Sequence, residues 1–450
     1  MNLLKKFPVI FALTFLHSIL FADWPAWRGP TGNGIGSAEN LPVEWTTDAN
    51  ISWKVAMPAW SGSSPIVIGD KIYVLSPSKQ DAPPPSEPAP TGRRRRPAPP
   101  PGMGPGGQDI LLICLSTKNG AIQWQTKLDE GNQIQFKQNM SSPSPVSDGG
   151  HIWTVTGNGV VTAVTMDGKI VWQYKLQKSH WKLGLLAGYA SSPILFEDKL
   201  IIQVLHGMHT DDPSYLLALD KKTGRQLWYH ERETDAVHES PDSYATPALS
   251  NTKDGIQLII LGGDYVTGHD LGTGMEIWRA GGLNPKKARN YRIIPSPVAF
   301  DGMIYAPTRK KPLLALRAGG KGDVTDSHLV WKYDKPAGSP DVPTPITDGK
   351  YFYMVEDFGQ VTCLDAKSGE TVWGPESTGL GRVSSSPVLA NGKIYITAED
   401  TETAVVQAGS KFKLLGKSEL DGSFTLSTPA VSGNQLFIRT GNYLYCISEG

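Results

Sequence analysis

Short runs of alternating apolar and polar residues recur along this chain, each separated from the next by a turn. In one copy, residues 386–389 predict an inner strand, Asn391-Gly392 a tight hairpin and residues 393–397 a second strand. Residues 403–408 and 411–416 then predict a third and an outer strand. Four short strands in about 40–50 residues are typical of one blade of a β-propeller.

A hydroxyl residue followed by proline opens eight such copies. The pairs are Ser64-Pro65, Ser142-Pro143, Ser192-Pro193, Thr246-Pro247, Ser296-Pro297, Thr344-Pro345, Ser386-Pro387 and Thr428-Pro429. A single blade cannot bury both of its faces, so repeated blades stack around an axis. The pattern therefore predicts an all-β fold, an eight-bladed β-propeller of four-stranded antiparallel blades.

The eighth copy ends before a fourth strand, whereas residues 51–55 form an unassigned strand that contains Trp53. Closing the ring with this N-terminal strand removes both exposed sheet edges, which are aggregation liabilities. The alternative is a seven-bladed ring with a separate C-terminal piece. Eight copies and a matching unassigned strand favour the closed eight-bladed ring.

The turn before the outer tryptophan carries the most specific motif. Residues 218–228 read Ala-Leu-Asp-Lys-Lys-Thr-Gly-Arg-Gln-Leu-Trp, and residues 363–373 and 269–278 are close copies. The motif resembles the tryptophan-docking repeat of pyrroloquinoline-quinone (PQQ) dehydrogenases and of the propeller lipoprotein that helps assemble outer-membrane β-barrels. The resemblance covers the chain from Trp53 to its end. It implies a PQQ-like propeller of the quinoprotein alcohol dehydrogenase-like superfamily.

The residues of this motif have a structural explanation. Asp and Thr fix the turn by local hydrogen bonds, Gly permits a positive φ, and Trp wedges between neighbouring blades. The motif residues are Asp220, Thr223, Gly224, Trp228, Trp278 and Trp373. None of these roles requires a ligand, so the motif indicates the fold far more strongly than the function.

The chain start predicts export. Lys5 and Lys6 precede an apolar run, so residues 1–22 are expected to be a signal peptide, with a membrane anchor as the alternative. We expect residues 23–50 to form a clamp against the ring and residues 51–450 to form the propeller. The expected protein is periplasmic or secreted, monomeric, and without a transmembrane span after signal removal.

Composition adds three constraints. The formal net charge is zero, but residues 1–22 carry +2 and residues 77–108 carry +3, so the remainder carries −5. An acidic body argues against a nucleic-acid partner. The segment 77–108 is rich in Pro, Gly and Arg and is expected to be a disordered insertion in blade one, or else a tether to an acidic partner. The three separated cysteines predict packing rather than disulfides or a lipid anchor.

Signatures of catalysis are weak. The resemblance to quinone dehydrogenases implies adjacent cysteines and a Ca²⁺ site, but no two cysteines are adjacent here. We therefore expect no cofactor, with PQQ and calcium as the alternative. His206, His209 and Asp211 could ligate a transition metal, but a solvated polar loop explains them more simply. Whether the chain is an enzyme stays open, and a non-catalytic protein is favoured.

The links that lead into each inner strand and the links between strands two and three should emerge on one rim of the ring. Polar and aromatic residues in these links should converge there and hold a polar ligand, a metal ion or a partner loop, unless the charges merely neutralise one another in water. The candidate ligand-binding residues are His238, Glu239, Tyr244, Asp264, Tyr291, Arg292, Arg309, Glu356, Arg382 and Arg439.

Three functions follow from these observations. The favoured one is an exported, non-catalytic scaffold that binds a protein, a glycan or a small polar ligand through this rim. The first alternative is a PQQ- and calcium-dependent quinoprotein dehydrogenase. The second is an envelope-assembly propeller resembling the barrel-assembly lipoprotein.

Overall fold

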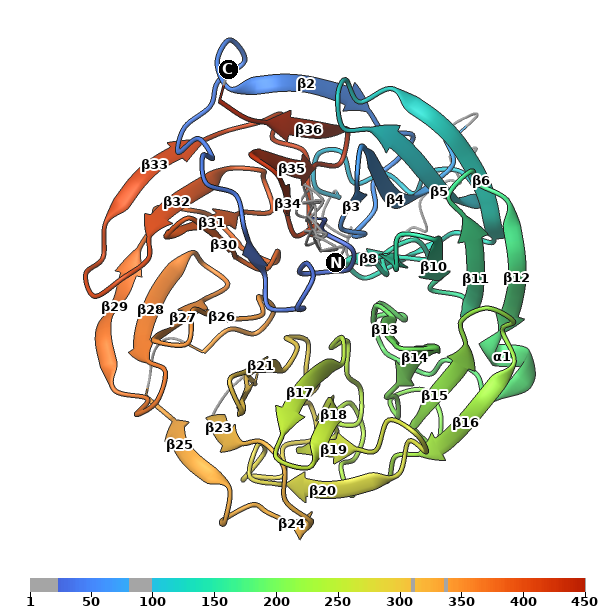
Figure 1. Cartoon of the computed structure of the whole chain (residues 1–450), viewed down its shortest axis with the longest axis vertical. Helices are drawn as coiled ribbons and strands as arrows, with labels where there is room; N and C mark the ends of the chain where they lie inside the picture. The colour runs from blue at the N-terminus through green and yellow to red at the C-terminus, as the bar shows by residue number, and fades with distance from the viewer. Residues whose placement is uncertain (1–22, 81–98, 309–311, 336–338, 450) are drawn as a thin grey trace, which may run out of the picture.

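Eight blade sheets surround a central axis in this computed structural model, which describes residues 23–80, 99–308, 312–335 and 339–449 (Figure 1). Six of these sheets have four strands, and two gain a short fifth strand. Neighbouring strands within each blade pair antiparallel. The eight-bladed propeller predicted from the repeats is confirmed. A single short helix, α1 (Leu176–Ser179), lies among the described residues.

The strands of the first four blades run from the axis outwards in chain order. Blade one contains β3 (Ile66–Ile68), β4 (Lys71–Pro77), β5 (Asp109–Ser116) and β6 (Ile122–Glu130). Blade two contains β9 (Val146–Ser147), β10 (His151–Val155), β11 (Val160–Thr165) and β12 (Ile170–Lys175). Blade three contains β13 (Ile194–Phe196), β14 (Lys199–Val204), β15 (Tyr215–Asp220) and β16 (Gln226–Glu231). Blade four contains β17 (Ala248–Thr252), β18 (Gly255–Gly262), β19 (Tyr265–His269) and β20 (Glu276–Ala280).

The last four blades follow the same order, and the eighth borrows its outer strand from the N-terminus. Blade five contains β21 (Val298–Phe300), β22 (Met303–Ala306), β23 (Leu313–Arg317) and β25 (Leu329–Tyr333). Blade six contains β26 (Ile346–Thr347), β27 (Tyr351–Val355), β28 (Gln360–Asp365) and β29 (Thr371–Ser377). Blade seven contains β30 (Val388–Ala390), β31 (Lys393–Thr397), β32 (Thr403–Gln407) and β33 (Leu414–Ser418). Blade eight contains β34 (Ala430–Ser432), β35 (Gln435–Arg439), β36 (Tyr443–Ile447) and β2 (Ile51–Ala56).

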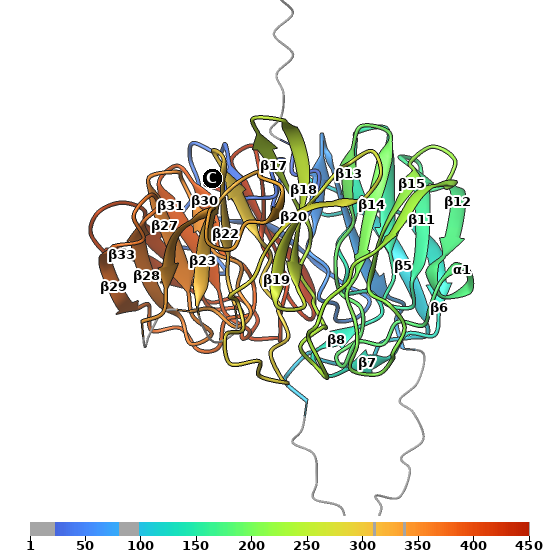
Figure 2. The same ribbon diagram turned by 90° about the horizontal axis from the view of Figure 1, so that it is seen from below.

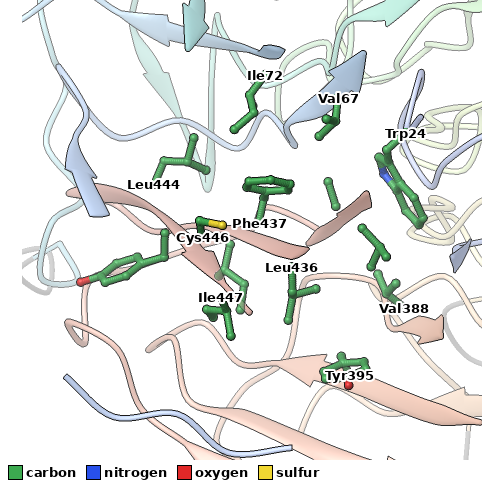
Figure 3. Packing of buried hydrophobic residues seen from close by; sticks show 14 of the residues in the cluster. Trp24, Val67, Ile72, Val388, Tyr395, Leu436, Phe437, Leu444, Cys446 and Ile447 are labelled. Carbon is green, nitrogen blue, oxygen red and sulfur yellow. The ribbon is translucent and has the colours of Figure 1, made fainter. Parts of the chain in front are cut away.

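The N-terminal strand closes the ring as predicted. Strand β2 pairs antiparallel with β36, and Trp53 lies opposite Cys446 in this register. The apolar cluster of this seam joins blades seven, eight and one and extends to Trp24, as Figure 3 shows. The pairing covers the edge of β36, which would otherwise expose unpaired backbone groups.

The outer tryptophans dock on the turn of the next blade. The Gly224 turn packs against Trp172, and the Gly274 turn packs against Trp228, whose indole N–H donates to the Leu271 carbonyl at 3.1 Å. Because both glycines have positive φ and their Cα atoms face an indole ring, a side chain there would be strained and would clash.

Trp278 departs from the prediction that each tryptophan wedges between blades. Its indole N–H donates to the Gln257 side chain of its own sheet at 2.8 Å, and its ring covers Gly268. Blade five replaces the docking turn with an insertion that contains the short strand β24 (Gly322–Asp323), which pairs with β20. The next blade therefore offers Trp278 no glycine turn.

The three cysteines are free, buried and equivalent in position. Cys114 pairs with Trp124, Cys363 with Trp373, and Cys446 with Trp53 in the strand registers. Each cysteine thus occupies the place that Ala218 holds opposite Trp228. Burial raises the pKa of all three thiols, so they are packing residues rather than reactive groups.

The segment 77–108 has defined structure at its described ends, which differs from the expected disordered insertion. Met103 is buried against Trp60 and Phe424. The Asn132 side-chain amide donates to two carbonyl groups of this segment, at 2.6 and 3.1 Å. The expectation overlooked the apolar side chain of Met103 amid prolines and glycines. The central residues of the segment lie outside the described residues.

Candidate functional site

Eight hydroxyl groups form a closed hydrogen-bonded ring around the axis. The backbone N–H of each residue donates to the side-chain oxygen of the corresponding residue in the next blade, at 2.8–3.2 Å. The last of these bonds runs from Thr428 to Ser64 and closes the circle. The members are Ser64, Ser144, Ser192, Thr246, Ser296, Thr344, Ser386 and Thr428.

This hydroxyl ring corrects one repeat boundary. The sequence pattern assigned Ser142-Pro143 to blade two, but Ser144 occupies the ring position. Strand β9 begins at Val146, so Pro145 takes the place of the repeated proline. Ser142 instead accepts the Asn139 backbone N–H. The sequence holds two successive Ser-Pro pairs that fit the repeat equally well, and the strand pairing shows which of them begins the blade.

All eight hydroxyl residues line an axial cavity of about 420 Å³. Trp27 lines this cavity and also a groove on the opposite side, formed by residues 25–32 with parts of blades two to five. Trp27 therefore lies between the two spaces, and the segment that contains it crosses one end of the cavity. The other end is a mouth bordered by Phe136 and by polar residues of several blades.

Residues 24–36 cross the closed end from blade one to blade seven. Trp24 bridges to Val67, and β1 (Ile35–Gly36) pairs parallel with β30. Between them, the fully buried Arg28 guanidinium donates to the carbonyl groups of Thr344 and Pro345 at 3.1 and 2.7 Å. Burial without a carboxylate partner in the described chain lowers the pKa of Arg28 to about 9.

Charged groups from three blades meet at the mouth. Arg292 lies 3.1 Å from Glu239 and 3.8 Å from Asp341. All three side chains line the cavity and are largely shielded from solvent. Because the residues come from different blades, their pairing also ties together the links that surround the mouth.

Tyr244 and Asp242 stabilise the wall of the mouth by accepting hydrogen bonds from the backbone. The Tyr244 hydroxyl accepts the Ala187 backbone N–H at 2.9 Å, and burial raises the pKa of this phenol. The Asp242 carboxylate accepts backbone N–H groups of Leu186, Gly207 and Met208 at 2.8–3.1 Å. Burial outweighs these three bonds and raises the pKa of Asp242 to about 6.

Asp357 and Arg382 complete the opposite side of the mouth. Asp357 accepts the backbone N–H groups of Asp341 and Val342, and burial raises the pKa of its carboxyl. The Arg382 guanidinium lies 4.9 Å from the centre of the exposed Phe358 ring. The cation and the aromatic ring thus stack at the rim of the cavity.

Four of the ten candidate residues therefore line one cavity: Glu239, Tyr244, Arg292 and Arg382. Three others are internal. Asp264 is held by the Asn284 side chain, Tyr291 donates to Thr308, and Arg439 donates to the carbonyl groups of blade one. These residues stabilise loops and the closing seam instead of facing a ligand. Glu356 is also outside the cavity lining, and Arg309 lies outside the described residues.

The suggested metal cluster does not assemble. His206 is buried, with one ring nitrogen accepting the Gly184 N–H and the other 3.0 Å from the Pro213 carbonyl. Asp211 and His238 border a separate groove with His206. No group of three His, Cys, Asp or Glu side chains is placed to hold a metal ion within the described ranges. His206 instead orders its own loop.

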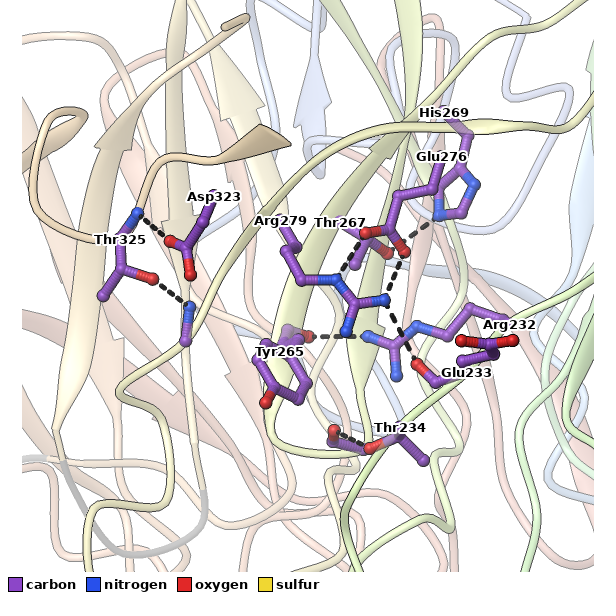
Figure 4. Close-up of polar contacts among 12 residues, drawn as sticks. Arg232, Glu233, Thr234, Tyr265, Thr267, His269, Glu276, Arg279, Asp323 and Thr325 are labelled. Carbon is purple, nitrogen blue, oxygen red and sulfur yellow. Dashed lines mark hydrogen bonds and ion pairs between the residues drawn. The ribbon is translucent and has the colours of Figure 1, made fainter. Parts of the chain in front are cut away.

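Another polar cluster lies in blade four, outside the cavity (Figure 4). Arg279 pairs with Glu276 at 2.5 Å and lies 4.9 Å from the Tyr265 ring centre. The buried Arg232 donates to the Tyr265 carbonyl at 3.2 Å. These contacts join the side chains to one another and to the backbone, which indicates a role in stability.

The sequence reading missed several residues of the cavity. Phe136, Lys137 and Asp341 belonged to no recognised pattern, and Trp27 of the predicted clamp was not expected to line the cavity. One signal could have found Asp341. It stands three residues before a repeated hydroxyl-proline pair, much as Arg292 and Arg382 stand four residues before theirs.

The chain is similar to two groups of proteins. Residues 108–375 match the family described as outer membrane protein assembly factor BamB. Outer membrane protein assembly factor BamB of Yersinia pestis is 25% identical over 342 residues, covering 73% of this chain and 77% of that protein. Quinohemoprotein alcohol dehydrogenase ADH-IIG of Pseudomonas putida is 28% identical over 167 residues, covering 35% and 21%.

Solved structures share the fold. Europium-containing methanol dehydrogenase superposes with a TM-score of 0.67 at 13% identity, covering 92% of this chain and 89% of that one. BamB from Moraxella catarrhalis superposes with a TM-score of 0.54 at 16% identity, covering 76% and 95%. Because the family match spans more than half of the sequence, and the repeats and fold agree with it, this chain belongs to the family of outer membrane protein assembly factor BamB.

Proposed function

We propose that this protein is a non-catalytic envelope-assembly scaffold, exported to the periplasm, that docks a protein partner on the face around the cavity mouth. Family membership supports the assembly role. No helix of the described residues is long and apolar enough to cross a membrane. The expected signal peptide, residues 1–22, lies outside the described part of the chain and supports export by its sequence alone.

The observation that carries the docking proposal is a pair of exposed phenylalanines at the mouth. Phe136 and Phe358 are 66% and 65% exposed, the two most exposed large apolar side chains in the described residues. Phe136 occupies the hairpin between β7 (Ile134–Gln135) and β8 (Gln138–Asn139), which lies on one face of the ring (Figure 2). Phe358 contacts Arg382 at the cavity rim.

The hairpin places Phe136 outward at a conformational cost. Its φ is +56°, a left-handed conformation that bulky residues rarely adopt. The adjacent Lys137 pairs with Glu399 of blade seven at 2.6 Å, which holds the hairpin against the far side of the mouth. Exposed aromatic rings beside arginine are the residue types that dominate binding energy at protein interfaces.

The lining of the cavity favours a scaffold over a protein that binds quinone and calcium. Two carboxylates of the cavity, Glu239 and Asp341, pair with Arg292, and Asp357 accepts two backbone N–H groups. Calcium takes six to eight oxygen ligands, from carboxylates, carbonyl groups and water. The carboxylates that line this cavity are committed to partners within the protein, and the sequence lacks adjacent cysteines. These features support a scaffold rather than a quinone-dependent dehydrogenase.

Depletion of the protein in its own host tests the assembly role. We expect lower amounts of folded outer-membrane β-barrels, measured by heat-modifiable migration of outer-membrane proteins. The wild-type chain should restore them, whereas the double variant Phe136→Asp, Phe358→Asp should not.

The matched control places the same charge elsewhere. Val171 on the outer strand β12 is 46% exposed, and Val171→Asp should restore assembly fully. Unchanged barrel levels after depletion would refute the assembly role. Full rescue by the double phenylalanine variant would refute the docking face.

A further inference from the structure

The hydroxyl ring leaves hydrogen-bonding capacity in the axial cavity. Each side-chain oxygen accepts a backbone N–H, so its own O–H hydrogen is still available. Among the described residues, none accepts a hydrogen bond from these eight hydroxyls. A molecule on the axis would therefore meet a circle of O–H donors, each with a further lone pair that can accept.

The cavity also offers apolar faces. Trp27 lies at one end, and Tyr244 stands in the wall with Leu186 and Ile294 beside it. Aromatic rings present a flat apolar surface to a ligand that has both C–H and O–H groups. The arrangement combines flat apolar contact with many weak polar contacts.

The charges that line the cavity balance. Three cations, Lys137, Arg292 and Arg382, stand with three carboxylates, Glu239, Asp341 and Asp357. Lys137 additionally pairs with Glu399, and Arg292 pairs with both Glu239 and Asp341. A ligand with net charge would gain little from such a lining, whereas a neutral ligand rich in hydroxyl groups can bond to both members of each pair.

We propose that the axial cavity binds a neutral sugar ring, with Trp27 against one apolar face and the hydroxyl ring around its oxygens. This site lies inside the mouth that the proposed protein-docking face surrounds, and the test of sugar binding does not depend on a protein partner. A free monosaccharide and the terminal residue of a glycan share this chemistry. The mouth is the side by which either would enter.

Saturation-transfer NMR and calorimetry on the full mature chain test the proposal. The probes are D-glucose, D-galactose, N-acetyl-D-glucosamine and maltohexaose, with gluconate as the charged counterpart. We expect at least one neutral sugar to bind with a Kd on the order of 1 mM or tighter, consistent with a ligand of this size. Tighter binding of maltohexaose than of glucose would identify the end of a glycan as the ligand. Tighter binding of glucose would identify a free monosaccharide.

Gluconate tests the nearby Arg28, whose buried charge has no carboxylate partner in the described chain. Binding of gluconate that exceeds that of every neutral sugar and weakens with salt would overturn the neutral-sugar class. Failure of all the neutral sugars to bind would overturn the proposal itself.

Variants at two tryptophans locate the site. Trp27→Ala should weaken sugar binding at least tenfold, and Trp27→Tyr should recover part of the loss because a flat ring is restored. Trp181 is 43% exposed and does not line the cavity, so Trp181→Ala should bind as the wild type does. Circular dichroism melting should be similar in all three variants.

Unchanged binding in Trp27→Ala would place the sugar elsewhere and refute the proposal. If Trp27→Ala fails to fold, iodide quenching of the tryptophan fluorescence with and without sugar provides the second readout. Comparing the wild type with Trp27→Tyr assigns to Trp27 the sugar-dependent protection that only the wild type shows. Absence of any sugar-dependent protection would contradict the site.

Discussion

The two ends of the axial channel are built differently. At the closed end, Arg28 and Asn33 are buried and donate to backbone carbonyl groups of blades five and six. At the mouth, Arg292 and Glu239 pair side chain to side chain and keep some solvent contact. Backbone partners cannot move without moving a blade, whereas paired side chains can exchange partners. The buried polar groups of the closed end therefore serve stability, whereas those of the mouth are free to serve binding.

Removing residues 23–56 is expected to have the largest effect. The deletion removes Arg28 and strand β2, so β36 loses its partner and the seam of Figure 3 becomes exposed. The shortened chain should unfold or form oligomers in size-exclusion chromatography. A monomer with an unchanged melting temperature would show that residues 23–56 do not stabilise the ring.

Arg28→Ala should be the most damaging single change at the closed end. It leaves the buried carbonyl groups of Thr344 and Pro345 without these donors, at a cost of about 3 kcal/mol in unfolding free energy. Arg382→Ala at the mouth is the matched control and should cost less than about 0.5 kcal/mol. Denaturant unfolding measures both, and equal losses would contradict the distinction between the two ends.

Asp242 should make stability depend on pH. The pKa of this carboxyl is about 6 in the folded chain and near 3.8 when unfolded, so the folded state binds the proton more tightly. Its contribution is therefore most favourable below about pH 4 and is lost as pH rises through about 6, by about 3 kcal/mol at most.

The measurement is the unfolding free energy of wild type and Asp242→Asn across this window. The variant should lack the decline between about pH 4 and pH 7 that this group gives the wild type. Parallel curves for the two chains would show that Asp242 titrates normally.

The ion pair at the mouth should contribute little net stability. Removing both partners, Glu239→Ala with Arg292→Ala, should change the unfolding free energy by less than about 1 kcal/mol. Arg292→Ala alone should lower the unfolding free energy more than the double variant does. The single change leaves the Glu239 carboxylate partly buried without the cation that pairs with it. The double variant should nevertheless lose partner binding, and retention of binding would remove these residues from the docking face.

The segment between β4 and β5 should give the smallest effect. Replacing residues 81–98 with a short Gly-Ser link should change stability by less than about 0.5 kcal/mol, because loop closure depends weakly on length. Met103→Ala should instead cost about 2 kcal/mol, since Met103 packs on Trp60 and Phe424. Thermal melting distinguishes the two outcomes, and a large loss from the link would show that the replaced residues stabilise the ring.

Local order in the sequence determined the number of blades and their turns. Asp220 and Thr223 form the predicted hydrogen bonds within four residues of one another, and the strand of Trp53 matched the gap in blade eight. Such features depend on neighbours along the chain or on a repeated pattern, so they can be predicted from the sequence.

Tertiary structure alone decided which residues share the axis. Glu239, Arg292 and Asp341 meet at the mouth because each occupies the link that enters the inner strand of a different blade. Asp264 and Arg439 belong to equally polar links but turn inward, toward an amide and toward backbone carbonyl groups. Side-chain direction depends on which partner satisfies each polar group, and that partner comes from a distant part of the chain.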